Sequence, residues 1–324
     1  MCVYVTAPAR SYIHVVGSSV VYPFMALMSE EFAREYKTHV PVVESLGTGA
    51  GVKLFCSGLG VSNPDILMSS RRMTDVEKVF CESNGISEVL ELNIGFDGLV
   101  FASVISEPVQ NFSLQDLFNA ISSHILSSSG ELLKNQYYYW NEINSSLENK
   151  RIEIFGPVRN SGTYQSILDL ILCTACLSDY RYRMVYDIPG ILDICKSIRD
   201  DGTYIEGGVN SNIVVQRMQQ KNNIYAIFSY SFLNKNRSLI HANKIDGVLP
   251  EYDLIVRKRY PLSRPIYLYV KVDHIQFVPR LLQYLQKLVS DNSIGEYGYM
   301  RDIGLIVLSQ EERTNLQSKV FSLS

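Results

Sequence analysis

A pattern that occurs four times in this chain narrows the range of folds open to it. Each time, a short apolar run ends in a cluster of Gly, Ser and Thr, and a helix-like stretch follows. The runs span residues 13–16, 42–44, 66–68 and 152–155, and the clusters that follow them are Gly17-Ser18-Ser19, Gly47-Thr48-Gly49-Ala50-Gly51, Ser69-Ser70-Arg71 and Ser161-Gly162-Thr163. Strands that alternate with helices predict an α/β fold with a mainly parallel sheet covered on both faces.

The four clusters also indicate a chemistry. The first N–H groups of a helix have no partner within the helix and carry partial positive charge, so they attract anions. Glycine lets a ligand approach the backbone, and Ser and Thr hydroxyls add donors. Any single cluster is better explained as a helix cap or a flexible joint. Four together favour helix starts that converge on one oxyanion, to which Arg71 can donate two parallel hydrogen bonds.

Length and composition set the class of protein. A chain of 324 residues is long for one hydrophobic core and suits two lobes. A net charge of −3 and a pI near 6.0, without a block of Lys or Arg, argue against a nucleic-acid binder. No apolar stretch approaches the roughly 20 residues of a membrane-spanning helix. The motifs G-x-S-x-G and H-E-x-x-H are absent and the five histidines are scattered, so we expect no enzyme, metal or cofactor site.

Two features remain open from the residues alone. Residues 1–9 contain Ala7-Pro8-Ala9, which has the form of a signal-peptide cleavage site, so this segment is either the remnant of an export signal or a chance match. Cys173 and Cys176 lie in an apolar helical stretch. For these two cysteines, buried free thiols and a disulfide to Cys195 are equally favoured.

Six longer segments carry a resemblance that covers residues 12–313. They are Val16-Gly-Ser-Ser-Val-Val-Tyr-Pro23, Leu46-Gly-Thr-Gly-Ala-Gly-Val-Lys53, Pro64-Asp-Ile-Leu-Met-Ser-Ser-Arg-Arg-Met73, Asn93-Ile-Gly-Phe-Asp-Gly-Leu-Val100, Asn160-Ser-Gly-Thr163 and Tyr260-Pro-Leu-Ser-Arg-Pro265. With these segments the chain resembles the periplasmic phosphate-binding proteins of ABC importers, the PstS-like members of the type II periplasmic binding protein family.

The resemblance implies a two-lobed α/β clamshell that holds phosphate between its lobes. Lobe I would comprise residues 10–100 and 266–324, lobe II would comprise residues 101–265, and the two hinge strands would lie near residues 98–103 and 265–270. The ligand-binding residues implied by the matching positions are Ser19, Val20, Thr48, Ser70, Arg71, Ser161, Gly162 and Thr163.

The same resemblance implies partners and a location. They are inorganic phosphate and the permease and ATPase subunits of an ABC importer, with the receptor a monomer in the periplasm. An exported family also favours a disulfide between Cys56 and Cys81, which lie in two successive helix candidates.

Two positions depart from the family pattern. Many members have an Asp at the position of Ser70, where it accepts the phosphate proton and rejects sulfate, and an Arg at the position of Pro157. A receptor for another tetrahedral oxyanion, such as sulfate or phosphonate, is therefore an alternative. A second alternative is a phosphoester hydrolase that uses Ser161 or Ser70, although no base or metal cluster lies near either serine in the sequence.

Overall fold

The structure is a computed structural model that describes residues 10, 12–127, 129–159, 161–184, 190–208, 210–221 and 223–323. The segment 1–9, interpreted above as either a signal remnant or a chance match, and Asn160 of the segment Asn160-Ser-Gly-Thr163 lie outside the described residues. The chain forms two compact units, one of Met1–Asp97 with Arg264–Ser324 and one of Gly98–Ser263. It passes between them within strand β4 (Val89–Val104) and at the start of strand β13 (Ser263–Lys271), the two strands expected to act as hinges.

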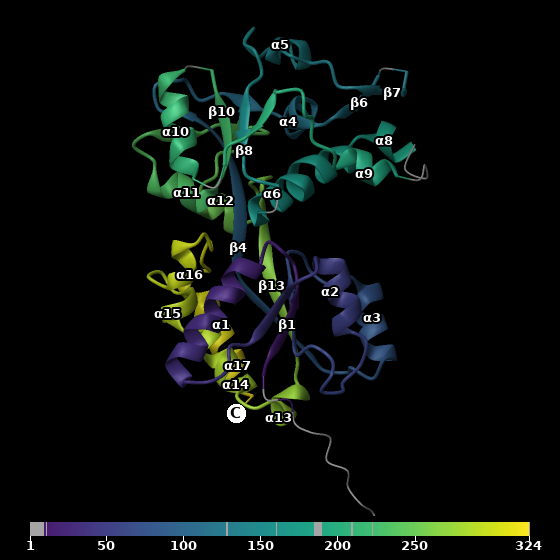
Figure 1. Ribbon diagram of the computed structural model, residues 1–324, viewed down its shortest axis with the longest axis vertical. Helices are drawn as coiled ribbons and strands as arrows, with labels where there is room; N and C mark the ends of the chain where they lie inside the picture. Colours follow the sequence, from purple (N-terminus) through teal and green to yellow (C-terminus); the bar gives the residue numbers. More distant parts are fainter. Residues whose placement is uncertain are drawn as a thin grey trace, which may run out of the picture. The chain divides into compact units, whose positions relative to one another are not determined.

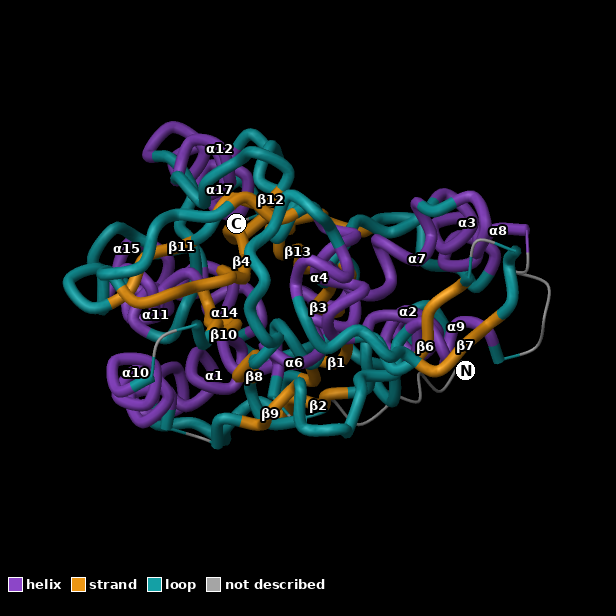
Figure 2. The backbone as a smooth tube through the Cα atoms, turned by 90° about the horizontal axis from the view of Figure 1, so that it is seen from above, coloured by secondary structure: helices purple, strands orange, loops and turns teal. Residues whose placement is uncertain are grey.

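The first unit is built on a sheet whose strand β1 (His14–Gly17) lies between β2 (Val42–Ser45) and β3 (Ile66–Ser69) and runs parallel to both. β13 pairs with β3 in the antiparallel direction. Helices α2 (Thr48–Phe55) and α3 (Asp75–Ser83) lie on one side of β1, and α1 (Tyr22–Tyr36) lies on the other (Figures 1 and 2). The remaining helices of this unit are α13 (His274–Phe277), α14 (Leu281–Leu288), α15 (Asp291–Ile294), α16 (Tyr299–Asp302) and α17 (Gln310–Phe321).

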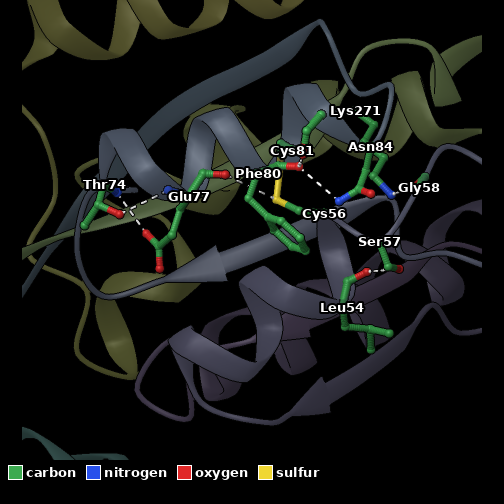
Figure 3. Close-up of a disulfide and its surroundings, with 11 residues drawn as sticks. Leu54, Cys56, Ser57, Gly58, Thr74, Glu77, Phe80, Cys81, Asn84 and Lys271 are labelled. Atoms are coloured by element: carbon green, nitrogen blue, oxygen red, sulfur yellow. Dashed lines mark hydrogen bonds between the residues drawn. A yellow bond between two sulfur atoms is a disulfide. The ribbon is translucent and has the colours of Figure 1, made fainter.

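Buried side chains hold α2 and α3 to this sheet. The cluster consists of Val16, Val52, Phe55, Cys56, Leu67, Met73, Cys81, Ile86, Tyr267 and Tyr269. Burial of each large apolar side chain contributes about 1.5–3 kcal/mol. The predicted disulfide is confirmed, since Cys56 is bonded to Cys81 within this cluster (Figure 3). Cys81 is the buried residue of α3, so the disulfide is a main attachment of this helix to the unit.

The second unit has its own sheet, in which β4 pairs with the antiparallel β10 (Tyr225–Ser229). β8 (Ile154–Gly156) lies parallel to β10 on one side and to β9 (Tyr204–Glu206) on the other. Helices α10 (Ser211–Gln220) and α11 (Tyr230–Lys235) lie on one side of β10, and α9 (Ile191–Cys195) lies on the other (Figures 1 and 2).

Shorter elements complete the second unit. The helices are α4 (Leu114–Ile121), α5 (Trp140–Ile143), α6 (Gly162–Ser166), the π-helix η1 (Ile167–Cys173), α7 (Thr174–Ser178), α8 (Tyr180–Met184) and α12 (Tyr252–Val256). The strands are β5 (Asn111–Phe112), β6 (His124–Leu126), β7 (Leu132–Lys134), β11 (Ile240–Ala242) and β12 (Lys244–Ile245).

The cysteines of the second unit resolve the alternative left open above. Cys176 in α7 is bonded to Cys195 at the end of α9, and Cys173 is a free thiol. Burial raises the pKa of the Cys173 thiol, because the thiolate loses its hydration. Of the two candidates for Cys195, the structure therefore pairs the one in α7 and leaves the residue at the end of η1 unpaired.

One expectation about secondary structure is wrong. The alternation of strand and helix candidates in the sequence predicts two separate strands, at residues 89–93 and 99–103. The structure has one continuous strand, β4. Gly95 has φ +151° and a Cβ at this position would lie 2.7 Å from the Ile306 carbonyl oxygen. Here glycine permits a close backbone contact, and the strand continues because Phe96 pairs with Ile306.

Candidate oxyanion site

Three of the four clusters lie at one edge of the first sheet. Gly17, the last residue of β1, pairs with Ser45 in β2 and with Met68 in β3, so the three parallel strands end side by side. The clusters that begin at Gly17, Gly47 and Ser69 lie at these strand ends. The carboxyl ends of parallel strands are where α/β sheets bind ligands.

Two glycines bring this edge together. The carbonyl oxygen of Gly17 accepts hydrogen bonds from the N–H groups of Leu46 and Gly47, at 2.9 and 2.8 Å, which fixes the turn before α2. A Cβ at Gly51 would lie 2.5 Å from the Gly17 Cα, and a Cβ at Gly17 would lie 2.1 Å from the Met68 carbonyl oxygen. Glycine is therefore required at both positions, because α2 packs directly on the end of β1 at Gly51 and the backbone of β3 lies against Gly17.

The first cluster lies just before α1, which begins at Tyr22. The N-cap of α1 is Val21, and Ser18 is buried. The Ser18 hydroxyl accepts a hydrogen bond from the Val20 N–H at 3.3 Å, while the Ser18 carbonyl oxygen accepts from Val21 and Tyr22. Ser19 is only partly buried. The first turn therefore presents the Ser19 hydroxyl, and the Val20 N–H has a long hydrogen bond within the turn.

The second and third clusters meet through their hydroxyl groups. Thr48 Oγ1 lies 3.4 Å from Ser70 Oγ and accepts a hydrogen bond from the Ser70 N–H at 3.5 Å. Both side chains are partly buried, and both hydroxyls can donate as well as accept. The structure thus places two of the predicted ligand residues side by side, although they are 22 residues apart in the sequence.

Arg71 has a partner that the sequence did not predict. Its guanidinium donates two hydrogen bonds to Glu77, from Nη1 to Oε2 at 2.8 Å and from Nη2 to Oε1 at 2.7 Å. These bonds hold the pKa of the Glu77 carboxyl at about 2, well below its usual value. Glu77 also forms the capping box of α3 with Thr74 (Figure 3).

The fourth cluster lies in the second unit, at the carboxyl end of β8. Ser161 is the N-cap of α6, and its hydroxyl accepts from the Tyr164 N–H at 3.1 Å and donates to the Val158 carbonyl oxygen at 2.8 Å. Gly162 is the first residue of the helix. Ser161 and Thr163 line a hollow of about 220 Å³.

Residues from two further strand ends line the same hollow, and sequence reasoning missed them. Gly207 and Gly208 follow β9, and Ser229 at the end of β10 is the N-cap of α11, where its hydroxyl accepts from the Phe232 N–H. Ser229 shows the pattern of the four clusters in a weaker form, a strand that ends in a single hydroxyl residue before a helix. Because β8, β9 and β10 are parallel, their carboxyl ends share one edge of the second sheet.

Pro157, one of the two positions that depart from the family pattern, lies close to the fourth cluster. Pro157 lines the hollow, and its carbonyl oxygen lies 3.5 Å from the Tyr204 hydroxyl. Arg159, two residues before Ser161, forms an ion pair with Glu206 at 2.7 Å, and both side chains are exposed.

In the described part of the chain, no three His, Cys, Asp or Glu side chains group to hold a metal ion. No helix among the described residues is long and apolar enough to cross a membrane.

Curated proteins with similar sequences are known. Among curated proteins, the chain is 26% identical over 267 residues to Protein SphX of Synechococcus elongatus, which covers 81% of this chain and 68% of that protein. It is 23% identical over 310 residues to the phosphate-binding protein PstS of Staphylococcus saprophyticus, which covers 94% of this chain and 82% of that protein.

Solved structures and a family model agree on the fold. A "possible phosphate binding protein" from Planctomyces limnophilus matches with a TM-score of 0.75 at 22% identity, over 97% of this chain and 98% of that one. An ABC-type phosphate transport receptor from Vibrio cholerae matches with a TM-score of 0.57 at 19% identity, over 89% and 99%. The family model of the PBP superfamily domain matches residues 3–292. The chain therefore belongs to the PBP superfamily and has its two-unit α/β fold.

Proposed function

We propose that the chain is a receptor that binds inorganic phosphate and delivers it to an ABC phosphate importer. The observation that carries the proposal is the pair of partly buried hydroxyls of Thr48 and Ser70 at the edge where β1, β2 and β3 end. Hydroxyl and backbone donors at such an edge suit an oxyanion. The relatives named as phosphate-binding proteins and phosphate transport receptors support phosphate as that anion.

The proposed phosphate ligands are those expected from the sequence. They are Ser19, Val20, Thr48, Ser70, Arg71, Ser161, Gly162 and Thr163. Binding without chemical conversion is the proposed activity, because the hydrogen bonds of Thr48, Ser70 and Ser161 among the described residues go to hydroxyl or backbone groups. A serine nucleophile needs an adjacent base for activation.

The proposal extends to partners and location. By its likeness to transport receptors, the chain would work as a monomer in the periplasm and would pass phosphate to the permease and ATPase subunits of the importer. Fractionation of cells that express the full-length gene product tests the location, and analytical ultracentrifugation tests the oligomeric state.

A second candidate ligand class follows from two positions. Pro157 supplies no charge, and Ser70 supplies no carboxylate that would repel an unprotonated anion. Sulfate and phosphonate are therefore the alternative ligands of the same residues.

Calorimetric titration tests the function and the site together. We expect one inorganic phosphate to bind per chain, with sulfate, phosphonate and arsenate as comparison ligands. Ser70→Ala and Thr163→Ala should each weaken phosphate binding by about 1–3 kcal/mol, the usual loss when a hydrogen bond to a charged group is removed. Ser318→Ala, which removes an exposed hydroxyl of α17 that bonds only within its helix, is the matched control. Unchanged phosphate affinity in both Ser70→Ala and Thr163→Ala would reject the site, and no binding of phosphate to the unmodified chain would reject the function.

A further inference from the structure

The backbone of Arg71 is fixed by its neighbour Ser69. Ser69 is fully buried at the end of β3, and its hydroxyl accepts a hydrogen bond from the Arg71 N–H at 3.3 Å and donates one to the Arg71 carbonyl oxygen. Two residues further on, the Met73 N–H donates to the buried Tyr269 hydroxyl at 2.9 Å. The loop between β3 and α3 is therefore fixed at both ends, so the Arg71 side chain extends from it in a defined direction.

The guanidinium of Arg71 is held as well, although its side chain is 45% exposed. Nη1 and Nη2 each donate to one oxygen of Glu77, and Nη1 also donates to the Arg72 carbonyl oxygen at 3.0 Å. Glu77 is itself fixed, because its Oε2 accepts from the Thr74 N–H at 2.8 Å at the first turn of α3. Exposed arginine side chains usually sample many rotamers, whereas this one is restrained at three points.

One edge of the planar Arg71 guanidinium has N–H groups that donate to no described residue. A guanidinium has five N–H groups in a rigid plane. Three of them are used, two by Glu77 and one by the Arg72 carbonyl oxygen. The other two, on Nε and Nη2, lie on one edge of the plane, and no described residue accepts from them. Two parallel N–H groups on one edge match the spacing of two oxygens in a tetrahedral oxyanion.

We propose that Glu77 is a positioning residue of the phosphate site, which holds Arg71 so that its Nε–Nη2 edge donates two parallel hydrogen bonds to the ligand. The inference rests on the proposed function, because it assigns a role within the same site. Arg71 directly follows Ser70, whose hydroxyl lies 3.4 Å from that of Thr48, so the Arg71 side chain starts from the backbone beside this pair of hydroxyls. Glu77 does not touch the ligand in this arrangement.

Two other roles for Glu77 predict different results. If its negative charge mainly repels the anion, its neutralisation should tighten binding, because like charges near a binding site disfavour the complex. If Glu77 only caps α3, its replacement by Gln should change stability and leave phosphate affinity unchanged, since Gln also serves in a capping box. A positioning role predicts weaker binding that depends on Arg71.

A double-mutant cycle on the full chain separates these cases. Phosphate affinity is measured by calorimetry for the unmodified protein, Glu77→Gln, Arg71→Ala and the double variant, with thermal unfolding as the control for folding. We expect Glu77→Gln to weaken phosphate binding about tenfold and to have less than a twofold effect in the Arg71→Ala background. Glu82→Gln removes a negative charge from the same helix and is the matched control, which we expect to stay within about twofold of the unmodified protein.

The outcomes are distinct. Tighter binding in Glu77→Gln, unchanged binding in Glu77→Gln, or equal weakening in both backgrounds overturns the positioning role. Unchanged affinity in Arg71→Ala removes Arg71 from the site and overturns it too. If the unmodified protein binds phosphate and the cycle gives one of these results, the proposed function stands without the inference. If the unmodified protein does not bind phosphate, the proposed function itself has failed.

Discussion

Removal of the Cys56–Cys81 disulfide is expected to loosen α3 and to lower the stability of the first unit. The disulfide closes a loop with a sequence separation of 25 residues. The loss of chain entropy in the unfolded state for a loop of this size corresponds to about 3–4 kcal/mol of stabilisation. Both cysteines are buried, at 0% and 1% exposure, and Cys81 is the buried residue of α3. Without the disulfide, few other buried contacts would attach α3 to the first unit.

The double variant Cys56→Ala/Cys81→Ala should therefore lose about 3–4 kcal/mol in the free energy of unfolding, measured by urea titration. Because the two units can unfold separately, hydrogen exchange of the α3 amides is measured in parallel and should become markedly faster. Cys173→Ala removes a free thiol of the second unit and serves as the control. A loss below about 1 kcal/mol together with unchanged exchange in α3 would refute the reasoning that the disulfide holds this helix.

Three further predictions concern the strand edge and its charges. Gly51→Ala should destabilise the protein by more than about 2 kcal/mol, whereas Gly49→Ala, whose Cβ would meet nothing within 4 Å, should not; equal thermal stability of the two variants contradicts the close packing. In competition calorimetry, about a thousandfold excess of sulfate should displace phosphate measurably, because Ser70 supplies no carboxylate that would repel sulfate. The displacement should be equal in Glu44→Gln, because the Glu44 carboxylate lies beside His14 of β1. Complete retention of phosphate would contradict the reasoning from the absent carboxylate at Ser70. Since the folded-state pKa of Glu77 is lowered to about 2, the stability lost in Glu77→Gln should be constant above about pH 5 and should shrink as the pH falls toward 2; a deficit that persists at pH 2 contradicts this linkage.

The sequence predicted the strand edge well because its signals are local. A strand, a hydroxyl or glycine cluster and a helix start lie within about ten residues of one another, and parallel strands bring such clusters to one edge. The three-residue spacing of Thr74 and Glu77 is typical of a capping box, and the structure has this capping box at the start of α3. Cys56 and Cys81 belong to successive helices of one unit, so their pairing was accessible as well.

Features that depend on packing were not predictable in the same way. Residues 89–93 and 99–103 were predicted as two strands, yet Gly95 between them lies within one continuous strand, because the Ile306 backbone, far away in the sequence, packs against it. Cys176 in α7 pairs with Cys195, whereas Cys173 is the last residue of the π-helix η1, and no periodicity in the sequence predicts such a helix. Ser229 was missed because a single serine after a strand is a common cap.

The ion pairs show why charge could not be assigned from the sequence. Arg71, which was predicted to contact an anion, already donates to Glu77 at a separation of 6 residues, and Arg159 near the fourth cluster already donates to Glu206 at a separation of 47. The two pairs add no net charge, so affinity for an anion at these positions must come from the direction of the remaining N–H groups and from neutral hydroxyl donors. Such donors distinguish anions by the placement of their oxygens and protons more than by total charge. Residues that fix donor geometry, such as Glu77 and Ser69, therefore matter to recognition as much as the residues that donate.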